Sequence, residues 1–252
     1  MEYAYLHFHV TLKDFISPAR RNQVIAYAVN RHASIKDVIE SCNVPHTEID
    51  LIIVNGVSVD FDYSVQHSDE IHVYPVCSTA THESVRPLYH LSPPIPGNPR
   101  FVIDANLGRL ARYLRLLGFD CLYRNDFADS SIAEISGKTH RIALTRDRKL
   151  LKRKIITYGY FVRTDIPKAQ VREILSRFNL YASLAPLTRC THCNEKLVST
   201  GKSTIAHHLK PLTRQYYDKF LMCSGCHRIY WQGSHSMRIE RLIEEFCRQP
   251  VQ

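Results

Sequence analysis

The sequence has no long apolar run. None of its uninterrupted apolar stretches approaches the roughly 18 residues that a transmembrane helix needs. The opening stretch, MEYAYLHFHVTLKDF, also lacks the basic region and apolar core of a secretory signal. These two absences predict a protein that does not enter a membrane and that is cytoplasmic.

Basic residues are scarce in the first part of the chain and abundant in the rest. Residues 1–100 hold seven Lys or Arg against eleven Asp or Glu, whereas residues 101–252 hold 26 against 13. Apolar residues make up 44% of the chain, which is ordinary for a globular protein and excludes global disorder. The charge division predicts more than one structural unit, and the basic unit is expected to bind a polyanion, usually nucleic acid.

Proline gathers in one place. Residues 79–100 contain five of the twelve prolines and show no sustained periodicity, which is typical of a linker. We therefore expect four segments, which are residues 1–78, a linker at 79–99, residues 100–182 and residues 183–252.

The first segment has the pattern of a small mixed α/β domain. Residues 3–12 alternate between apolar and polar, as in a strand with one buried face. A helix is expected from Ile35 to Cys42 with Ser34 as its N-cap, and a hairpin turn at Asn55-Gly56. The expected order is strand, strand, helix, strand, strand, strand.

This order resembles the β-grasp (ubiquitin-like) fold of small sulfur-carrier proteins. The resemblance implies either a sulfur-transfer or conjugation role or a module that binds a protein partner. Sulfur carriers act through a free terminal Gly-Gly, but here the last strand ends Tyr74-Pro75-Val76-Cys77 and the chain continues. An interaction or packing module is therefore favoured.

The second segment alternates short apolar stretches with helical patterns. The stretches at 101–103, 119–124, 141–145 and 158–164 predict a parallel sheet covered by helices on both faces. The carboxyl ends of parallel strands share one edge, which is where ligands bind in open α/β sheets. Carboxylates follow all four strands, namely Asp104, Asp126 or Asp129, Asp147 and Asp165.

Two interpretations of these carboxylates are open. An Asp that follows a strand is often only the N-cap of the next helix. Four carboxylates on one edge repel one another, however, and a divalent cation such as Mg²⁺ would offset that repulsion.

Basic side chains accompany the carboxylates. They suit the phosphates of a nucleic acid, although a charge run is also typical of a solvated face. The candidate RNA-binding residues are Arg109, Arg112, Arg115, Arg146, Arg148, Lys149 and Lys152.

The eight cysteines include two Cys-x-x-Cys pairs in the third segment. Such pairs are typical of a closed, structural zinc site in a zinc ribbon, and we expect Cys190, Cys193, Cys223 and Cys226 to be the ligands. The other four are expected to be buried small apolar residues, namely Cys42, Cys77, Cys121 and Cys247.

The strings FVIDANLGRLARYLRLLGFD and LTRDR resemble the Mut-seven C-terminal ribonuclease domain family, a branch of the PIN-like nucleases. The resemblance extends from about residue 100 to the C-terminus and includes the two cysteine pairs. It implies metal-dependent cleavage of single-stranded RNA, with Asp104, Asp129 and Asp147 holding Mg²⁺ or Mn²⁺ and Asp165 as a fourth acid. A bacterial member carries a β-grasp segment before this domain, as here. The alternative is a non-catalytic adaptor that binds RNA through the zinc ribbon and the basic face, in which the acids only cap helices.

Overall fold

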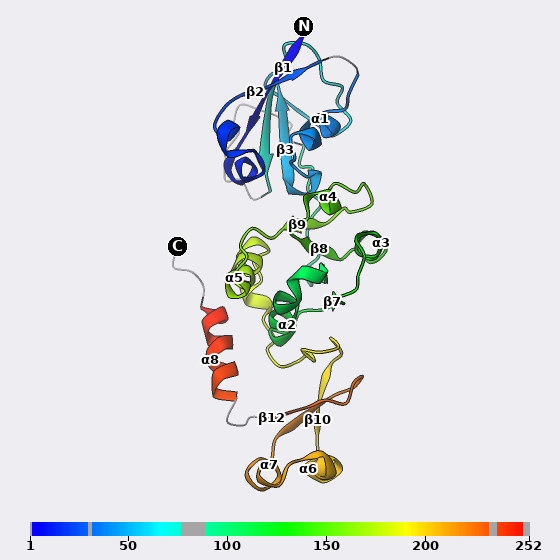
Figure 1. Ribbon diagram of the computed structural model, residues 1–252, viewed down its shortest axis with the longest axis vertical. Helices are drawn as coiled ribbons and strands as arrows, with labels where there is room; N and C mark the ends of the chain where they lie inside the picture. Colours follow the sequence, from blue (N-terminus) through cyan, green and yellow to red (C-terminus); the bar gives the residue numbers. More distant parts are fainter. Residues whose placement is uncertain (1, 30–31, 77–88, 232–235, 249–252) are drawn as a thin grey trace. The chain divides into compact units, whose positions relative to one another are not determined.

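The computed structural model describes residues 2–29, 32–76, 89–231 and 236–248 (Figure 1). Contacts divide the chain into two units. Unit 1 joins Met1–Ile95 to Asp129–Phe161, and unit 2 joins Pro96–Ala128 to Val162–Gln252. The predicted segment 100–182 therefore contributes to both units. Cys77 and residues 79–88 of the predicted linker lie outside the described residues.

A five-stranded mixed sheet forms the first part of unit 1, in the order β2-β1-β5-β3-β4. Strands β1 and β5 are parallel, and the other pairs are antiparallel. The predicted succession of strands and helix is confirmed. The strands are β1 (Tyr3–Phe8), β2 (Ile25–Ala28), β3 (Ile49–Val54), β4 (Val57–Val59) and β5 (Glu70–Pro75).

The first strand is shorter than its alternating pattern predicts. It ends at Phe8, and a 3₁₀ helix, η1 (Val10–Phe15), follows. Val10 has a φ of 50°, which a β-branched residue rarely adopts, so the extended chain is interrupted there. Leu12 and Phe15 are buried on η1 instead of on a strand.

The helix and the turn of this sheet form where the sequence predicts them. Helix α1 (Ile35–Ser41) is capped by Ser34, whose Oγ accepts a hydrogen bond from the N–H of Asp37 at 3.2 Å. Asn55 and Gly56 both have positive φ, 50° and 82°, as the tight turn between β3 and β4 requires.

Residues 129–161 pack against this sheet within unit 1. The carboxylate of Glu48, in η3 (His46–Glu48), accepts a hydrogen bond from the N–H of Phe161 at 2.7 Å. Nε2 of His46 lies 3.0 Å from the carbonyl oxygen of Ile156. Lys152 Nζ donates to the carbonyl of Glu40 at 2.6 Å.

The second sheet has four strands in the order β7-β6-β8-β9. The pairs β6–β7 and β8–β9 are parallel, as predicted. Every residue of β6 and β8 is buried, as expected for strands covered on both faces. The strands are β6 (Phe101–Ile103), β7 (Cys121–Tyr123), β8 (Ile142–Thr145) and β9 (Gly159–Phe161).

Helices flank these strands. Helix α2 packs against β7 and α5, and α3 and α4 pack against β8. Apolar residues repeat at helical spacing from Leu107 to Leu117, and this stripe is buried. The helices are α2 (Gly108–Leu116), preceded by η4 (Ala105–Leu107), α3 (Asp129–Thr139), α4 (Arg148–Leu151) and α5 (Pro167–Arg177). No helix among the described residues has the length and apolarity that crossing a membrane would take.

The last part of unit 2 holds an antiparallel sheet of three strands, β10 (Leu197–Thr200), β11 (Phe220–Cys223) and β12 (Ile229–Trp231). Two short helices, α6 (Lys202–Ile205) and α7 (Pro211–Tyr216), connect β10 to β11. Helix α8 (Ser236–Cys247) follows these strands. Its Phe246 is buried and lies 5.4 Å from Tyr113 of α2, ring centre to ring centre.

The cysteines outside the two pairs differ in burial. Cys121 is buried, as predicted, and Cys42 packs at the margin of the core of the five-stranded sheet. The prediction for Cys247 is wrong, because its side chain is exposed. Cys247 is the last residue of the amphipathic helix α8. Consecutive side chains of a helix point about 100° apart, so Cys247 does not share the buried face that Phe246 occupies.

Candidate functional site

The buried carboxylate of Asp104 follows β6 directly. Asp104 is only 6% exposed and occupies the N-cap position of η4, where its carbonyl accepts from the N–H of Leu107 at 2.9 Å. Among the described residues, however, its carboxylate does not cap that helix. Helix capping by the side chain therefore does not explain the presence of an aspartate at position 104.

Asp147 behaves differently. Its Oδ1 accepts a hydrogen bond from the N–H of Lys149 at 2.7 Å and caps α4. The hydroxyl of Thr145 in turn accepts from the N–H of Asp147 at 2.9 Å. The capping interpretation thus holds for this residue, but a carboxylate has about four acceptor sites, and one hydrogen bond leaves others for a cation.

The remaining candidates lie in three places. Asp129 is the first residue of α3 and is half-buried. Asp126 is exposed and forms a two-point ion pair with Arg124, at 2.9 and 2.7 Å. That hydrogen bonding lowers the pKa of the Asp126 carboxyl. Asp165 is exposed before α5. Asp104 and Asp165 belong to unit 2, whereas Asp129 and Asp147 belong to unit 1.

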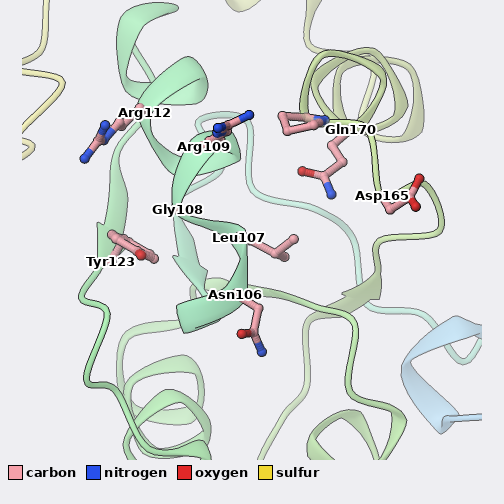
Figure 2. A pocket seen from close by; sticks show the side chains of 9 residues that line it. Asn106, Leu107, Gly108, Arg109, Arg112, Tyr123, Asp165 and Gln170 are labelled. Atoms are coloured by element: carbon pink, nitrogen blue, oxygen red, sulfur yellow. The ribbon is translucent and has the colours of Figure 1, made fainter.

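A cavity of about 370 Å³ in unit 2 brings several predicted site residues together. Asp165, Arg109 and Arg112 line it, and in the view of Figure 2 Arg109 lies between Arg112 and the side chains of Gln170 and Asp165. The complete lining is Asn106, Leu107, Gly108, Arg109, Arg112, Tyr123, Asp165, Pro167 and Gln170.

The wall formed by η4 and β7 depends on a close approach. The hydroxyl of Tyr123 donates to the carbonyl of Ala105 at 3.1 Å. A Cβ atom on Gly108 would lie 2.4 Å from that hydroxyl, so only glycine fits at the start of α2 without displacing the tyrosine. The tyrosine thereby fixes the turn that follows Asp104.

The loop before α5 is held from the helix. Gln170 is buried and its Nε2 donates to the carbonyl of Thr164 at 3.0 Å. The carboxylate of Glu173 accepts from the N–H groups of Arg163 and Thr164, at 2.8 and 3.2 Å. These bonds position Asp165. The sequence analysis did not identify Gln170 or Tyr123 as part of the site. Gln170 could have been found, because it is a polar residue beside Val171 on the apolar face of a helix.

Arg115 does not face the cavity. It is 3% exposed, and its Nε and Nη2 donate to the carbonyl of Cys121 at 3.0 and 2.8 Å. Its Nη1 donates to the carbonyl of His192 at 2.6 Å. Burial lowers the pKa of this guanidinium. Arg115 thus joins β7 to the first cysteine pair, and in this structure it is not available to RNA.

Two more predicted RNA-binding residues make contacts inside unit 1. Arg148 donates to the carbonyls of Phe15 and Asp14, at 2.9 and 3.4 Å, and lies over the rings of Phe15 and Phe161. Lys152 Nζ donates to the carbonyl of Glu40 in α1 and to Oδ1 of Asn43 in the turn after it, at 2.6 and 3.3 Å. Arg146 and Lys149, in contrast, are exposed, as are Arg109 and Arg112.

The four cysteines of the two pairs form one cluster. Their sulfur atoms all lie within 4.8 Å of one another, with Cys193 and Cys223 at 3.2 Å. Burial alone would raise the pKa of the Cys190 thiol, but the N–H of Cys193 and the hydroxyl of Tyr230 lower it to about 6. Four sulfurs at this spacing fit a structural zinc ion.

Comparison with known families covers most of the chain. Residues 1–81 match the family described as Mut7-C ubiquitin, and residues 99–243 match the family described as the Mut7-C RNAse domain. No curated protein and no solved structure gives a match. The order of the two domains is the one predicted from the sequence. The chain therefore belongs to the Mut7-C RNAse domain family and carries a Mut7-C ubiquitin domain before it.

Proposed function

We propose that the protein is a ribonuclease that hydrolyses phosphodiester bonds of single-stranded RNA and depends on Mg²⁺ or Mn²⁺. Membership of this family supports a nuclease function that acts on RNA. The observation that carries the proposal is Asp104, a carboxylate only 6% exposed that follows a buried strand and does not cap the helix it precedes. Acidic side chains are almost never this enclosed unless they are paired or hold a metal, which agrees with a role as a cation ligand.

Asp104, Asp129 and Asp147 are the proposed ligands of the catalytic cation, with Asp165 as a fourth acid. Each of Asp104 and Asp147 follows a fully buried strand, β6 and β8, which supports a similar role for the two. When bound, the cation would supply positive charge to the scissile phosphate and make water a better nucleophile.

The RNA is proposed to contact the exposed basic residues. Arg109 and Arg112 line the cavity beside Asp165, and a guanidinium binds phosphate through paired N–H donors. Arg146 and Lys149, next to Asp147, are proposed to hold flanking phosphates. Arg115, Arg148 and Lys152 are left out of this proposal because their side chains hold the protein's own backbone.

The cysteine cluster is proposed to hold a structural Zn²⁺, because four sulfur ligands leave no position for water or substrate. Four cysteines gathered as one candidate metal site rather than in disulfides favour a reducing compartment, and we propose a cytoplasmic location. The ubiquitin-like domain is proposed to bind a protein partner.

A cleavage assay with matched variants tests the catalytic proposal. Asp104→Asn should lower the rate on 5′-labelled single-stranded RNA by roughly 100-fold or more, which corresponds to a loss of about 3 kcal/mol of transition-state stabilisation. Asp126→Asn removes an exposed carboxylate and should leave the rate unchanged. EDTA should abolish cleavage by the wild type. Equal rates for the two variants would contradict the assignment.

A non-catalytic RNA-binding adaptor is the second candidate, and the cap that Asp147 gives α4 favours it. This alternative predicts RNA binding that falls steeply with salt and survives both Asp104→Asn and EDTA, with no cleavage under Mg²⁺ or Mn²⁺. The ribonuclease predicts that the variant binds RNA and loses only turnover.

A further inference from the structure

The outer face of the five-stranded sheet carries a row of histidines. Strands β1 and β5 are paired in a parallel register that sets His7 opposite His72. The residues next to these histidines on each strand point to the other face, into the core. Leu6 and Ile71 are examples, and both are fully buried. The row is therefore on the face that the core of this sheet does not use.

Three side chains of this face bring ligand atoms together. One ligand atom from each of His7, Glu70 and His72 lies within 4.8 Å of the other two. Nε2 of His7 is buried and has no hydrogen-bond partner among the described residues, although it lies directly against Oε1 of Glu70. The contact is that of an ion pair, and both atoms are of ligand types that first-row divalent metals accept.

A fourth residue fixes the cluster from outside. Nε2 of His9 lies 3.1 Å from Nδ1 of His72, and the ring of His9 stacks on Tyr74 with centres 4.2 Å apart. The rings of His7 and His72 are themselves stacked at 4.5 Å. Metal-ligating histidines usually have their other ring nitrogen hydrogen-bonded in this way, which sets the orientation of the ring.

The cluster is open to solvent on one side. The side chain of Glu70 is 49% exposed and that of His7 is 23% exposed, so an ion can enter and keep a water ligand. Two imidazoles and one carboxylate suit Zn²⁺ and its first-row neighbours, whereas Mg²⁺ prefers oxygen ligands. Ligands bound at about 2.0–2.2 Å lie roughly 3–4 Å apart around such an ion, which small side-chain rotations reach here.

We propose that His7, Glu70 and His72 form a second metal site, separate from the cysteine cluster, that binds Zn²⁺ on the outer face of the ubiquitin-like sheet. His9 is a positioning residue for His72. The site does not depend on the proposed nuclease activity, since none of these residues belongs to the catalytic proposal.

Zinc titration of the full chain tests the site. Wild-type protein, with its cysteine cluster already loaded, should take up one further Zn²⁺ per chain when followed by calorimetry, and His72→Gln should not. The matched control is His90→Gln, because His90 also pairs with a carboxylate, Asp50 at 2.8 Å, but lies outside the cluster. The control should bind like the wild type. His9→Phe should weaken binding by roughly 10- to 100-fold.

Glu70→Gln is a second variant for the case that His72→Gln does not fold. Glu70 is exposed, and its replacement leaves the row of histidines in place. This variant should also lose the additional zinc while keeping the circular dichroism spectrum of the wild type. Identical zinc uptake by the wild type, Glu70→Gln and His72→Gln would overturn the proposal, as would the absence of a second zinc in the wild type.

Discussion

Replacing Arg148 by alanine should loosen residues 129–161 from the ubiquitin-like sheet. The side chain donates to the carbonyl of Phe15 at 2.9 Å and lies 5.1 and 5.4 Å from the ring centres of Phe15 and Phe161. A charged hydrogen bond contributes about 1.5–3 kcal/mol and a cation–π contact about 0.5–1 kcal/mol. The longer bond to Asp14, at 3.4 Å, adds little. We therefore expect a loss of about 2–4 kcal/mol.

Hydrogen exchange measures this loss where it occurs. Amides around Phe15 and Phe161 should exchange roughly 30- to 900-fold faster in Arg148→Ala, because each 1.36 kcal/mol of opening free energy is about tenfold in exchange. Lys149→Ala is the control, since Lys149 is exposed beside it and should change exchange by less than about 0.5 kcal/mol. Unchanged exchange in Arg148→Ala together with weaker RNA binding would refute the structural role and restore the RNA contact predicted from sequence.

Three further changes separate structural from functional roles. Gly108→Ala should cost about 1–3 kcal/mol in thermal unfolding, because the new Cβ meets the hydroxyl of Tyr123, and Tyr123→Phe should recover part of that loss. Asp147→Asn should keep the helix cap, and therefore the stability, while RNA cleavage is lost. Asp147→Ala should lose the cleavage and also about 1 kcal/mol, and equal stability of these two variants would contradict the cap. Arg115→Ala should lower the unfolding free energy by about 2–5 kcal/mol, since the buried carbonyl of Cys121 loses its donors, and should leave RNA affinity unchanged at a temperature where the variant is folded.

The parts of the fold that follow from local pattern were predictable. The stripe from Leu107 to Leu117 and the helix that Ser34 caps are both present. In each, the spacing of apolar residues reflects a single buried face, and that face is set within a few residues of chain. Alternation misled only where Val10 turns the backbone out of the extended region.

Other features depend on residues far away in the sequence. Arg115 lies opposite the leucines of α2, a position that periodicity assigns to solvent, but the carbonyl of His192 lies against it. Arg148 follows a candidate catalytic acid, and its sequence position predicts an exposed basic side chain. It instead contacts Phe15 in η1, more than a hundred residues earlier in the chain. Periodicity identifies the apolar side of an element and says nothing about what covers its other side.

Because unit 1 is built from two separate segments of the chain, it cannot be completed until the second segment has been synthesised. Unit 1 needs both Met1–Ile95 and Asp129–Phe161, so the partner of Glu48 is made about a hundred residues after it. At roughly 5–20 residues per second, the ribosome needs about 6–23 s to reach Phe161 from there. During that interval the surface that later receives Phe161 and Arg148 is uncovered on the nascent chain.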